Sequence, residues 1–337
     1  MTEQTFIKNF TSTPEFRLLL IAVCVFGLMS VMSPDKFLSS QNLTSMAFQF
    51  PEFAILALAM TIAMMTGGID LSVVGVANLS AVLAAIILTN FSGPEMASAQ
   101  SVWWLVLAIV AALLIGAIAG LVNGSLIAFF GLPPILATLG SGLVFTGFAI
   151  AMTGGSAVMG FPDTVALIGN AQVFGIPIPL ILFSLLATIL HLILTRTAFG
   201  LSVTMYGANP LAALYAAINL NRMLLKVYVI SGMFSSVAGL IVMSRANSAK
   251  ADYGSSYLLL AVLIAVLGGV NPYGGYGRVI GVVLAVLSMQ FLSSGLNMLQ
   301  VSNFARELIW GVLLIVVMVL NTHSLAYLRS SLSKAPK

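Results

Sequence analysis

The chain has 337 residues, of which 60% are apolar and 7% are charged, and its mean hydropathy is +1.11. A soluble protein of this length needs far more charge to cover its surface, so the composition predicts an all-α, polytopic integral membrane protein. The net charge of +4 does not indicate nucleic-acid binding, because the basic residues fall at the ends of apolar segments.

Ten apolar runs follow one another with an even spacing, which predicts a single transmembrane domain over residues 1–337. The first run, 17–32, has no small-residue cleavage site and is expected to stay as a span rather than to be removed as a signal peptide. The eighth, 257–267, is short against the roughly 20 residues that cross a bilayer, so a broken, tilted or re-entrant segment is expected there. The other runs are expected at 46–66, 73–89, 103–130, 134–152, 178–194, 227–244, 279–296 and 308–320.

Ten crossings put both termini on the same side, and the basic residues indicate that this side is the cytoplasm. Four basic residues then lie outside, namely Lys36, Arg245, Lys250 and Arg306. Nine lie at cytoplasmic ends of segments: Lys8, Arg17, Arg196, Arg222, Lys226, Arg278, Arg329, Lys334 and Lys337. This distribution predicts that the loop 196–226 is cytoplasmic.

The loop 196–226 is the longest stretch with interspersed polar residues between two apolar segments. Pro210 can occupy the first turn of a helix, where its missing N–H costs nothing. Ala212, Ala213, Ala216 and Ala217 favour a short helix with a nearly featureless surface. Such a helix can press into a groove of a partner protein. The alternative is an ordinary cytoplasmic connector.

The sequence contains no motif for catalysis, for nucleotide hydrolysis or for a cofactor, and no cluster of residues with metal-ligand spacing. His191 and His323 each stand alone near the ends of runs. The acidic residues that could lie in the membrane are Glu52, Asp70 and Glu307, and all three are expected near run ends. A charge at a helix centre costs about 2.5–3.5 kcal/mol, and an ion-coupled carrier usually retains a few such charges. The pattern therefore favours a passive conduit that another subunit drives.

Two Gly-Gly pairs stand at equivalent places along the chain. Gly67–Gly68 is followed by an aliphatic residue and Asp70, and Gly268–Gly269 is followed by an aliphatic residue and Asn271. Each pair separates two apolar runs, where glycine permits tight turns or close approach of helices. Transporters often carry such Gly-interrupted repeats near their pathway. The alternative is that Gly-Gly is simply common in membrane proteins.

Several stretches resemble, in the right order, motifs of the membrane permeases of bacterial ribose/xylose-type sugar ABC importers, within the branched-chain amino acid and sugar permease superfamily. The chain departs from these motifs at Val74 and at Ala217, where the family usually has glycine. The matching stretches, which cover most of the chain from 50 to 320, are Gly67–Val73 (G-G-x-D-L-S-V), Pro133–Gly140 (P-x-[FI]-[IV]-A-T-L-G), Thr197–Gly200 (T-x-[FL]-G), Gly207–Asn219 (G-x-N-x-x-A-A-x-x-x-G-I-x) and Val266–Arg278 (V-x-G-G-x-x-x-x-G-G-x-G).

The resemblance implies a non-catalytic permease subunit of the bacterial inner membrane that moves a small polar solute, most simply a sugar. The expected partners are a periplasmic substrate-binding protein, cytoplasmic ABC ATPases that use ATP and Mg²⁺, a second permease copy or sister permease, and membrane lipid. The residues expected to couple to the ATPase are Gly207, Asn209, Ala212, Ala213, Ile218 and Arg222.

A pathway lined by small and weakly polar groups fits such a permease, because the binding protein delivers the solute. The candidates are Asp70, Ser72, Asn78, Asn123, Thr138 and Asn297, and the alternative for each is a role in helix packing. For Asp70 we favour a cap at the start of the following helix over contact with solute.

Two hypotheses from other classes remain. One is an ion-coupled secondary carrier for a neutral solute, with the ion held near Asp70, and the other is a membrane scaffold. Within the importer class the solute could also be a sugar alcohol, a furanosyl signal molecule, a nucleoside or a branched-chain amino acid.

Overall fold

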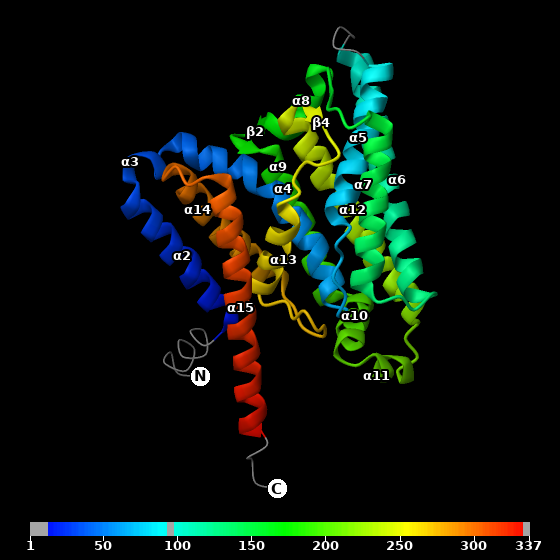
Figure 1. Cartoon of the computed structure of the whole chain (residues 1–337), viewed down its shortest axis with the longest axis vertical. Helices are drawn as coiled ribbons and strands as arrows, with labels where there is room; N and C mark the ends of the chain where they lie inside the picture. The colour runs from blue at the N-terminus through cyan, green and yellow to red at the C-terminus, as the bar shows by residue number, and fades with distance from the viewer. Residues whose placement is uncertain (1–12, 93–97, 333–337) are drawn as a thin grey trace.

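The computed structural model describes residues 13–92 and 98–332, with side chains described at 13–92 and 100–319. Lys8, Lys334 and Lys337 of the charge pattern lie outside these ranges, and His323 and Arg329 lie where the backbone alone is described. Helices make up most of the described chain (Figure 1). The all-α, multi-pass class predicted from composition is confirmed.

The helices are α2 (Pro14–Met32), α3 (Pro34–Phe37), α4 (Ser40–Met64), α5 (Val73–Phe91), α6 (Ser98–Ala128), α7 (Pro134–Thr153), α8 (Asp163–Asn170), α9 (Ile178–Arg196), α10 (Ala198–Ala208), α11 (Pro210–Tyr215), α12 (Leu220–Ala246), α13 (Tyr257–Leu267), α14 (Val279–Met298) and α15 (Asn303–Leu332). Two short antiparallel strand pairs join loops: β1 (Val158–Met159) with β4 (Ser248–Ala249), and β2 (Gln172–Val173) with β3 (Ile176–Pro177).

Eight helices in the described ranges are long and apolar enough to cross a membrane, namely α2, α4, α5, α6, α7, α9, α12 and α14. The predicted eighth run forms α13, which has 11 residues. At about 1.5 Å per residue such a helix covers roughly half of a bilayer core. The predicted tenth run lies within α15, a helix of 30 residues.

The second span begins earlier than predicted. Residues 40–45 are polar except for Leu43, yet they are helical, and Ser39 caps α4 by accepting a hydrogen bond from the Asn42 N–H at 3.2 Å. The Asn42 side chain is itself buried and donates to the Phe37 carbonyl at 2.8 Å. The expectation that Glu52 lies near the end of a run is therefore wrong. It lies in the middle of the 25-residue α4, directly after Pro51.

The core forms around α4 and α12. In the apolar stretch of α4, 83% of the residues are buried, compared with 22% in α9 and 17% in α2. Helix α4 is therefore central, and the other two are peripheral. Helix α12 lies close against α6, because a Cβ at Gly120 would stand only 2.2 Å from the Tyr228 carbonyl oxygen. Small residues of this kind let membrane helices approach backbone to backbone.

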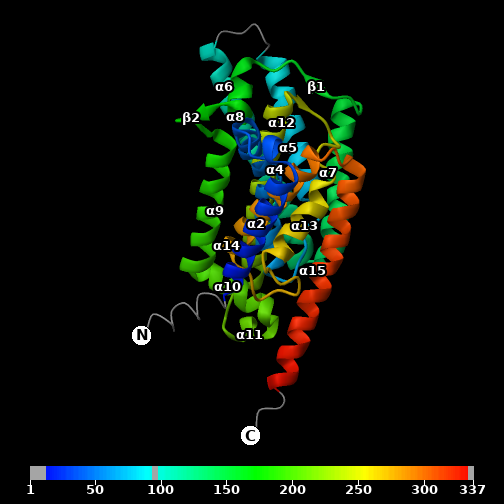
Figure 2. The ribbon, with the colours of Figure 1, turned by 90° about the vertical axis from the view of Figure 1, so that its left-hand side faces the viewer.

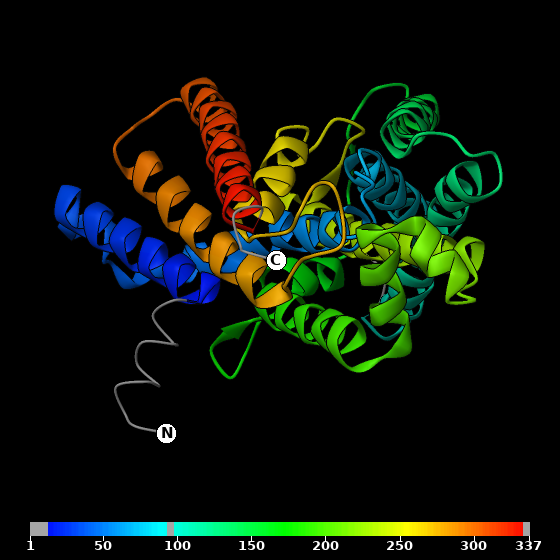
Figure 3. The same ribbon diagram turned by 90° about the horizontal axis from the view of Figure 1, so that it is seen from below.

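The molecule has two distinct ends. One, here called the α11 end, carries α10, α11, the loop 268–278, the start of α2 and the described end of α15 (Figures 1 and 2). The opposite end, called the strand end, carries α3, α8 and the strands. Viewed from the α11 end, α4 runs through the middle, with α2, α14 and α15 on one side and α5, α6 and α7 on the other (Figure 3).

Candidate functional site

A sharp turn opens the loop that was predicted to be cytoplasmic. Helix α9 ends at Arg196, and Thr197 caps α10 by accepting a hydrogen bond from the Gly200 N–H at 3.3 Å. A Cβ at Gly200 would stand 2.2 Å from the Leu194 carbonyl oxygen. The T-x-[FL]-G stretch therefore builds a turn that only glycine can close.

Helix α11 begins at Pro210, as predicted from the sequence. The Asn209 side chain caps it by accepting hydrogen bonds from the N–H groups of Leu211 and Ala212 at 3.0 and 3.1 Å. The helix ends at a left-handed residue, Ala217, with φ +58°. Ile218 N–H donates to the Ala213 carbonyl at 3.2 Å, which completes a Schellman motif. This is the position where the resembling family has glycine.

The surface of α11 is apolar. Leu211, Leu214 and Tyr215 are 66%, 55% and 88% exposed, whereas Ala213 is fully buried against its own chain. The expectation of a nearly featureless surface is wrong, because the large residues of the helix point outward and an alanine points inward. Ala212 is exposed on this surface. Of the other coupling candidates, Asn209 and Arg222 are exposed and Ile218 is half-buried.

Gly207 joins α10 to two other parts of the chain. A Cβ there would stand 2.0 Å from the Met65 carbonyl oxygen and 2.3 Å from the Gly275 nitrogen. Gly275 N–H in turn donates to the Met65 carbonyl at 3.0 Å. Gly67 and Gly274 approach at the same place, both with positive φ. We call Gly67, Gly207, Gly274 and Gly275, with Met65, the glycine junction.

Four of the six pathway candidates meet in one buried cluster. The Asp70 carboxylate, 2% exposed, accepts hydrogen bonds from the Ser72 hydroxyl at 2.6 Å, the Ser72 N–H at 3.1 Å and the Ser231 hydroxyl at 2.6 Å. The Asn123 amide donates to the Ser72 hydroxyl at 2.7 Å. Thr138 donates to the Ile69 carbonyl at 2.9 Å.

These bonds tie the segment between α4 and α5 to α6, α7 and α12. Burial raises the pKa of the Asp70 carboxyl, and hydrogen bonds from Ser231 and Ser72 act in the opposite direction. Both carboxylate oxygens accept hydrogen bonds from the protein itself. The Asp70 carboxylate thus holds a packed turn that precedes α5. It does not form the helix cap expected from the sequence, because Ser72 is the N-cap residue of α5 and no side-chain capping bond is described there.

The other two pathway candidates lie elsewhere. The Asn78 amide donates to the carbonyls of Ala251 and Tyr253, each at 2.9 Å, and so holds the loop between α12 and α13 at the strand end. Asn297 is exposed near the end of α14 and lines a cavity of about 270 Å³ together with Asn42 and Ser294. The six candidates therefore do not line one passage.

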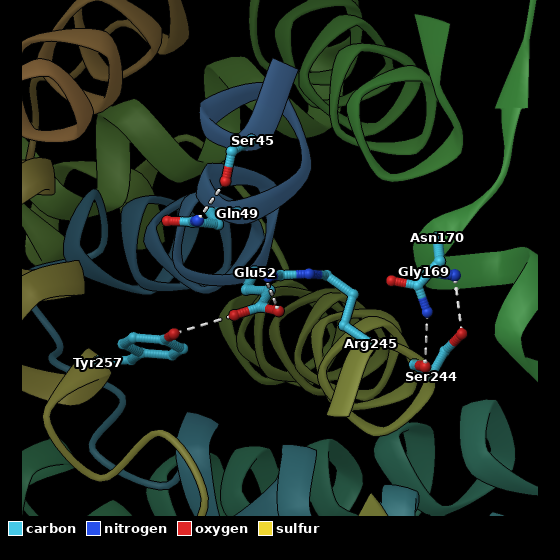
Figure 4. Close-up of polar contacts among 8 residues, drawn as sticks. All are labelled: Ser45, Gln49, Glu52, Gly169, Asn170, Ser244, Arg245 and Tyr257. Atoms are coloured by element: carbon cyan, nitrogen blue, oxygen red, sulfur yellow. Dashed lines mark hydrogen bonds and ion pairs between the residues drawn. The ribbon is translucent and has the colours of Figure 1, made fainter. Parts of the chain in front are cut away.

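A larger polar cavity, which the sequence did not predict, lies between α4, α12, α13, α14 and α15 in the strand-end half. Its volume is about 540 Å³. Glu52 pairs with Arg245 at 2.5 Å, and the Tyr257 hydroxyl donates to the second oxygen of Glu52 at 2.9 Å. Figure 4 shows these three side chains converging from α4, α12 and α13. The polar and aromatic residues of the lining are Gln49, Glu52, Phe53, Arg245, Tyr253, Ser256, Tyr257, Gln290, Ser293, Asn303, Arg306, Glu307 and Trp310.

On the side that faces the α11 end, the cavity ends at tightly packed residues of α4. From Ala54 to Met64, no residue of α4 is more than 2% exposed. A polar cavity therefore lies beside α4 in the strand-end half, whereas the part of α4 toward the α11 end is buried in protein. The signal that could have located the site is Glu52, a carboxylate that follows a proline inside an apolar run.

Residues 42–318 match the family model described as branched-chain amino acid transport system / permease component. The chain is 35% identical over 308 residues to the autoinducer 2 import system permease protein LsrD of Escherichia coli (strain K12), covering 90% of this chain and 89% of that protein. It is 34% identical to the protein of the same name from Photorhabdus luminescens, covering 90% and 88%. No solved structure matches the chain.

Proposed function

We propose how this chain, which belongs to the branched-chain amino acid transport system permease family, contacts its partners. It is a multi-pass permease subunit of an ABC importer in the inner membrane. The relatives import autoinducer 2 by their names, which supports a sugar-type solute. A furanosyl signal molecule is the narrower hypothesis that these names favour over a nucleoside or a branched-chain amino acid.

We place the α11 end in the cytoplasm, in contact with the partner ATPase. The exposed Leu211, Leu214 and Tyr215 form an apolar surface on a helix that stands clear of the bundle (Figure 1). Exposed apolar patches of this kind mark protein interfaces. Arg196 at the end of α9 and Arg222 at the start of α12 lie at the same end, as the positive-inside rule requires.

The observation that carries the proposal is the glycine junction, because it joins the exposed α11 surface to the central helix. Helix α10 leads directly into α11, and its Gly207 touches Met65 at the end of α4 and Gly275 in the loop between α13 and α14. A movement of α11 on ATP binding is passed through these backbone contacts to α4. Since α4 also carries Glu52, it links the ATPase surface to the polar cavity.

The chain forms one permease domain, binds no cofactor of its own, and leaves ATP and Mg²⁺ to the ATPase. A periplasmic substrate-binding protein delivers the solute at the strand end. Peripheral helices such as α6 and α7 expose apolar side chains, among them Leu114 and Leu143. We assign these faces to lipid and to a second permease copy or a sister permease.

The test uses the whole importer reconstituted in vesicles with its ATPase and binding protein. Leu214→Glu should abolish co-purification of the ATPase and ATP-driven uptake, because it places a charge in an apolar interface. The matched control is Leu167→Glu on α8, an equally exposed leucine (55%) at the opposite end, which should keep the ATPase bound. If the ATPase co-purifies normally with the Leu214→Glu variant, α11 is not the surface that binds the ATPase. Uptake that an ionophore abolishes and that needs no ATPase supports the ion-coupled carrier instead.

The orientation has its own test. In a background that lacks the exposed Cys24, an impermeant thiol reagent should label an Asp252→Cys variant in intact cells and leave Ser202→Cys unlabelled. Labelling of the Ser202→Cys variant reverses the assignment of the two ends.

A further inference from the structure

We propose that the polar cavity is a solute-binding site for a neutral, polyhydroxylated solute, in which Glu52 and Arg245 hold neighbouring hydroxyl groups. This inference rests on the proposed function and deepens it. The binding protein is expected to select the solute, and a site in the permease adds a second step of selection. The cavity volume of about 540 Å³ falls within the range of about 300–1,000 Å³ that is typical of small-molecule sites.

The charge of the lining selects against ionic solutes. Among the described residues of the lining, the carboxylates of Glu52 and Glu307 balance the guanidinium groups of Arg245 and Arg306. A solute with a net charge would leave one of these groups without compensation in a site partly shielded from water. A neutral solute leaves the balance unchanged.

The hydrogen-bonding capacity of the lining suits hydroxyl groups, which both donate and accept. Within the part of the chain that the structure describes, the Arg245 guanidinium makes a hydrogen bond only through Nη1, to Glu52. An arginine has five N–H donors, so further donors remain for a solute. Gln49 donates its amide to Ser45 at 2.7 Å and keeps its carbonyl oxygen as an acceptor. Figure 4 shows Gln49 beside Glu52, one turn earlier on α4.

Aromatic rings supply the apolar part of the site. Tyr257 packs edge-on against Phe53, with ring centroids 5.9 Å apart, and Trp310 lines the cavity from α15. A sugar ring presents C–H groups between its hydroxyls, and the combination of aromatic faces with a few convergent polar groups is how such ligands are held. The closed packing of α4 below Glu52 provides the floor.

The experiment measures protection of a thiol inside the cavity of the complete permease. In a Cys24→Ser background, Ser293→Cys places a thiol in the lining, and Asp252→Cys places one on the exposed loop of the same end. The rate of modification by an impermeant maleimide is measured with 100 mM D-ribose, D-xylose or D-glucose, and with D-ribose 5-phosphate. At least one neutral sugar should slow modification of Ser293→Cys threefold or more and leave Asp252→Cys unchanged. D-ribose 5-phosphate should have no effect.

A second comparison assigns the binding to the ion pair. Arg245→Gln should remove the protection by the sugar, whereas Arg278→Gln, which breaks an arginine–glutamate pair with Glu15 outside the cavity, should retain it. Absence of protection by all three sugars, equal protection at Asp252→Cys, or equal protection by the phosphate ester refutes the inference. If ATP-driven uptake by the parent importer persists while these results are negative, the proposed function stands and this site assignment alone is wrong.

Discussion

Gly207→Ala tests whether the glycine junction transmits movement from the ATPase surface to the core. The new Cβ would stand 2.0 Å from the Met65 carbonyl oxygen, which is roughly 1.5 Å closer than the optimal separation of about 3.5 Å. It would also stand 2.3 Å from the Gly275 nitrogen. Because backbone lies on both sides, no side chain can rotate away to make room. Helix α10 or the loop 268–278 must move.

The Gly207→Ala substitution changes three terms of the folding free energy. Inserting a methyl group into a packed contact costs about 1–3 kcal/mol, and loss of the Gly275–Met65 hydrogen bond costs about 1 kcal/mol more. Alanine regains about 0.5–1 kcal/mol because it is a better helix former than glycine. The net cost is about 1–3.5 kcal/mol, which is small enough for the protein to insert and large enough to displace α10 from α4.

The assay compares ATP hydrolysis with uptake in the reconstituted importer. We expect Gly207→Ala to bind the ATPase and hydrolyse ATP while its uptake falls at least fivefold. The matched control is Gly140→Ala, since Gly140 also lies in a helix, α7, but has no atom within 4 Å of the added Cβ. It should transport normally. Wild-type uptake in Gly207→Ala would show that the junction carries no movement.

Three further variants test local geometry. Ala217→Gly should raise the melting temperature, because a residue other than glycine at φ +58° costs about 1–2 kcal/mol, and an unchanged or lower value would contradict the strained turn. Asp70→Asn should keep most uptake and membrane level while Asp70→Leu loses both, since Asn retains an acceptor for Ser72; a well-expressed but inactive Asn variant would indicate contact with solute. Tyr228→Phe should match or exceed the wild type in stability, because its fully buried hydroxyl has no partner among the described residues; a loss of about 1 kcal/mol or more would refute this.

Signals that act within one segment could be predicted from the sequence. Apolar runs fixed the class and most spans, and Pro210 with Asn209 located the start of α11, because capping depends on neighbouring residues. The turn at Asp70 uses a local bond from the Ser72 N–H, but it precedes α5 instead of capping it, and its second partner, Ser231, is distant in the chain. The start of α4 was misplaced because its first turns are polar and gain stability from tertiary contacts, such as that of Asn42 with Ser294 at 2.9 Å.

Features that depend on packing between distant segments could not be predicted. Glu52 and Arg245 are far apart in the chain, and no pattern in either run states that they pair. The Gly-Gly pairs indicated tight turns or close approach of helices, but no pattern in the sequence names the segments that approach. In the structure Gly67 lies against Gly274, and Gly207 lies against Gly274 and Gly275.

Helix α4 connects the polar cavity, at Glu52, to the glycine junction, at Met65. Between Glu52 in the cavity and Met65 in the glycine junction, α4 covers roughly 20 Å at about 1.5 Å per residue, and its residues from Ala54 to Met64 are almost completely buried. A helix packed on all sides moves as a unit, because close-packed cores deform little. Pro51, just before Glu52, removes one hydrogen bond of the helix and permits a bend there. We therefore expect a push at Gly207 to reach the cavity as a displacement of Glu52 against Arg245, with the polar start of α4 staying in place.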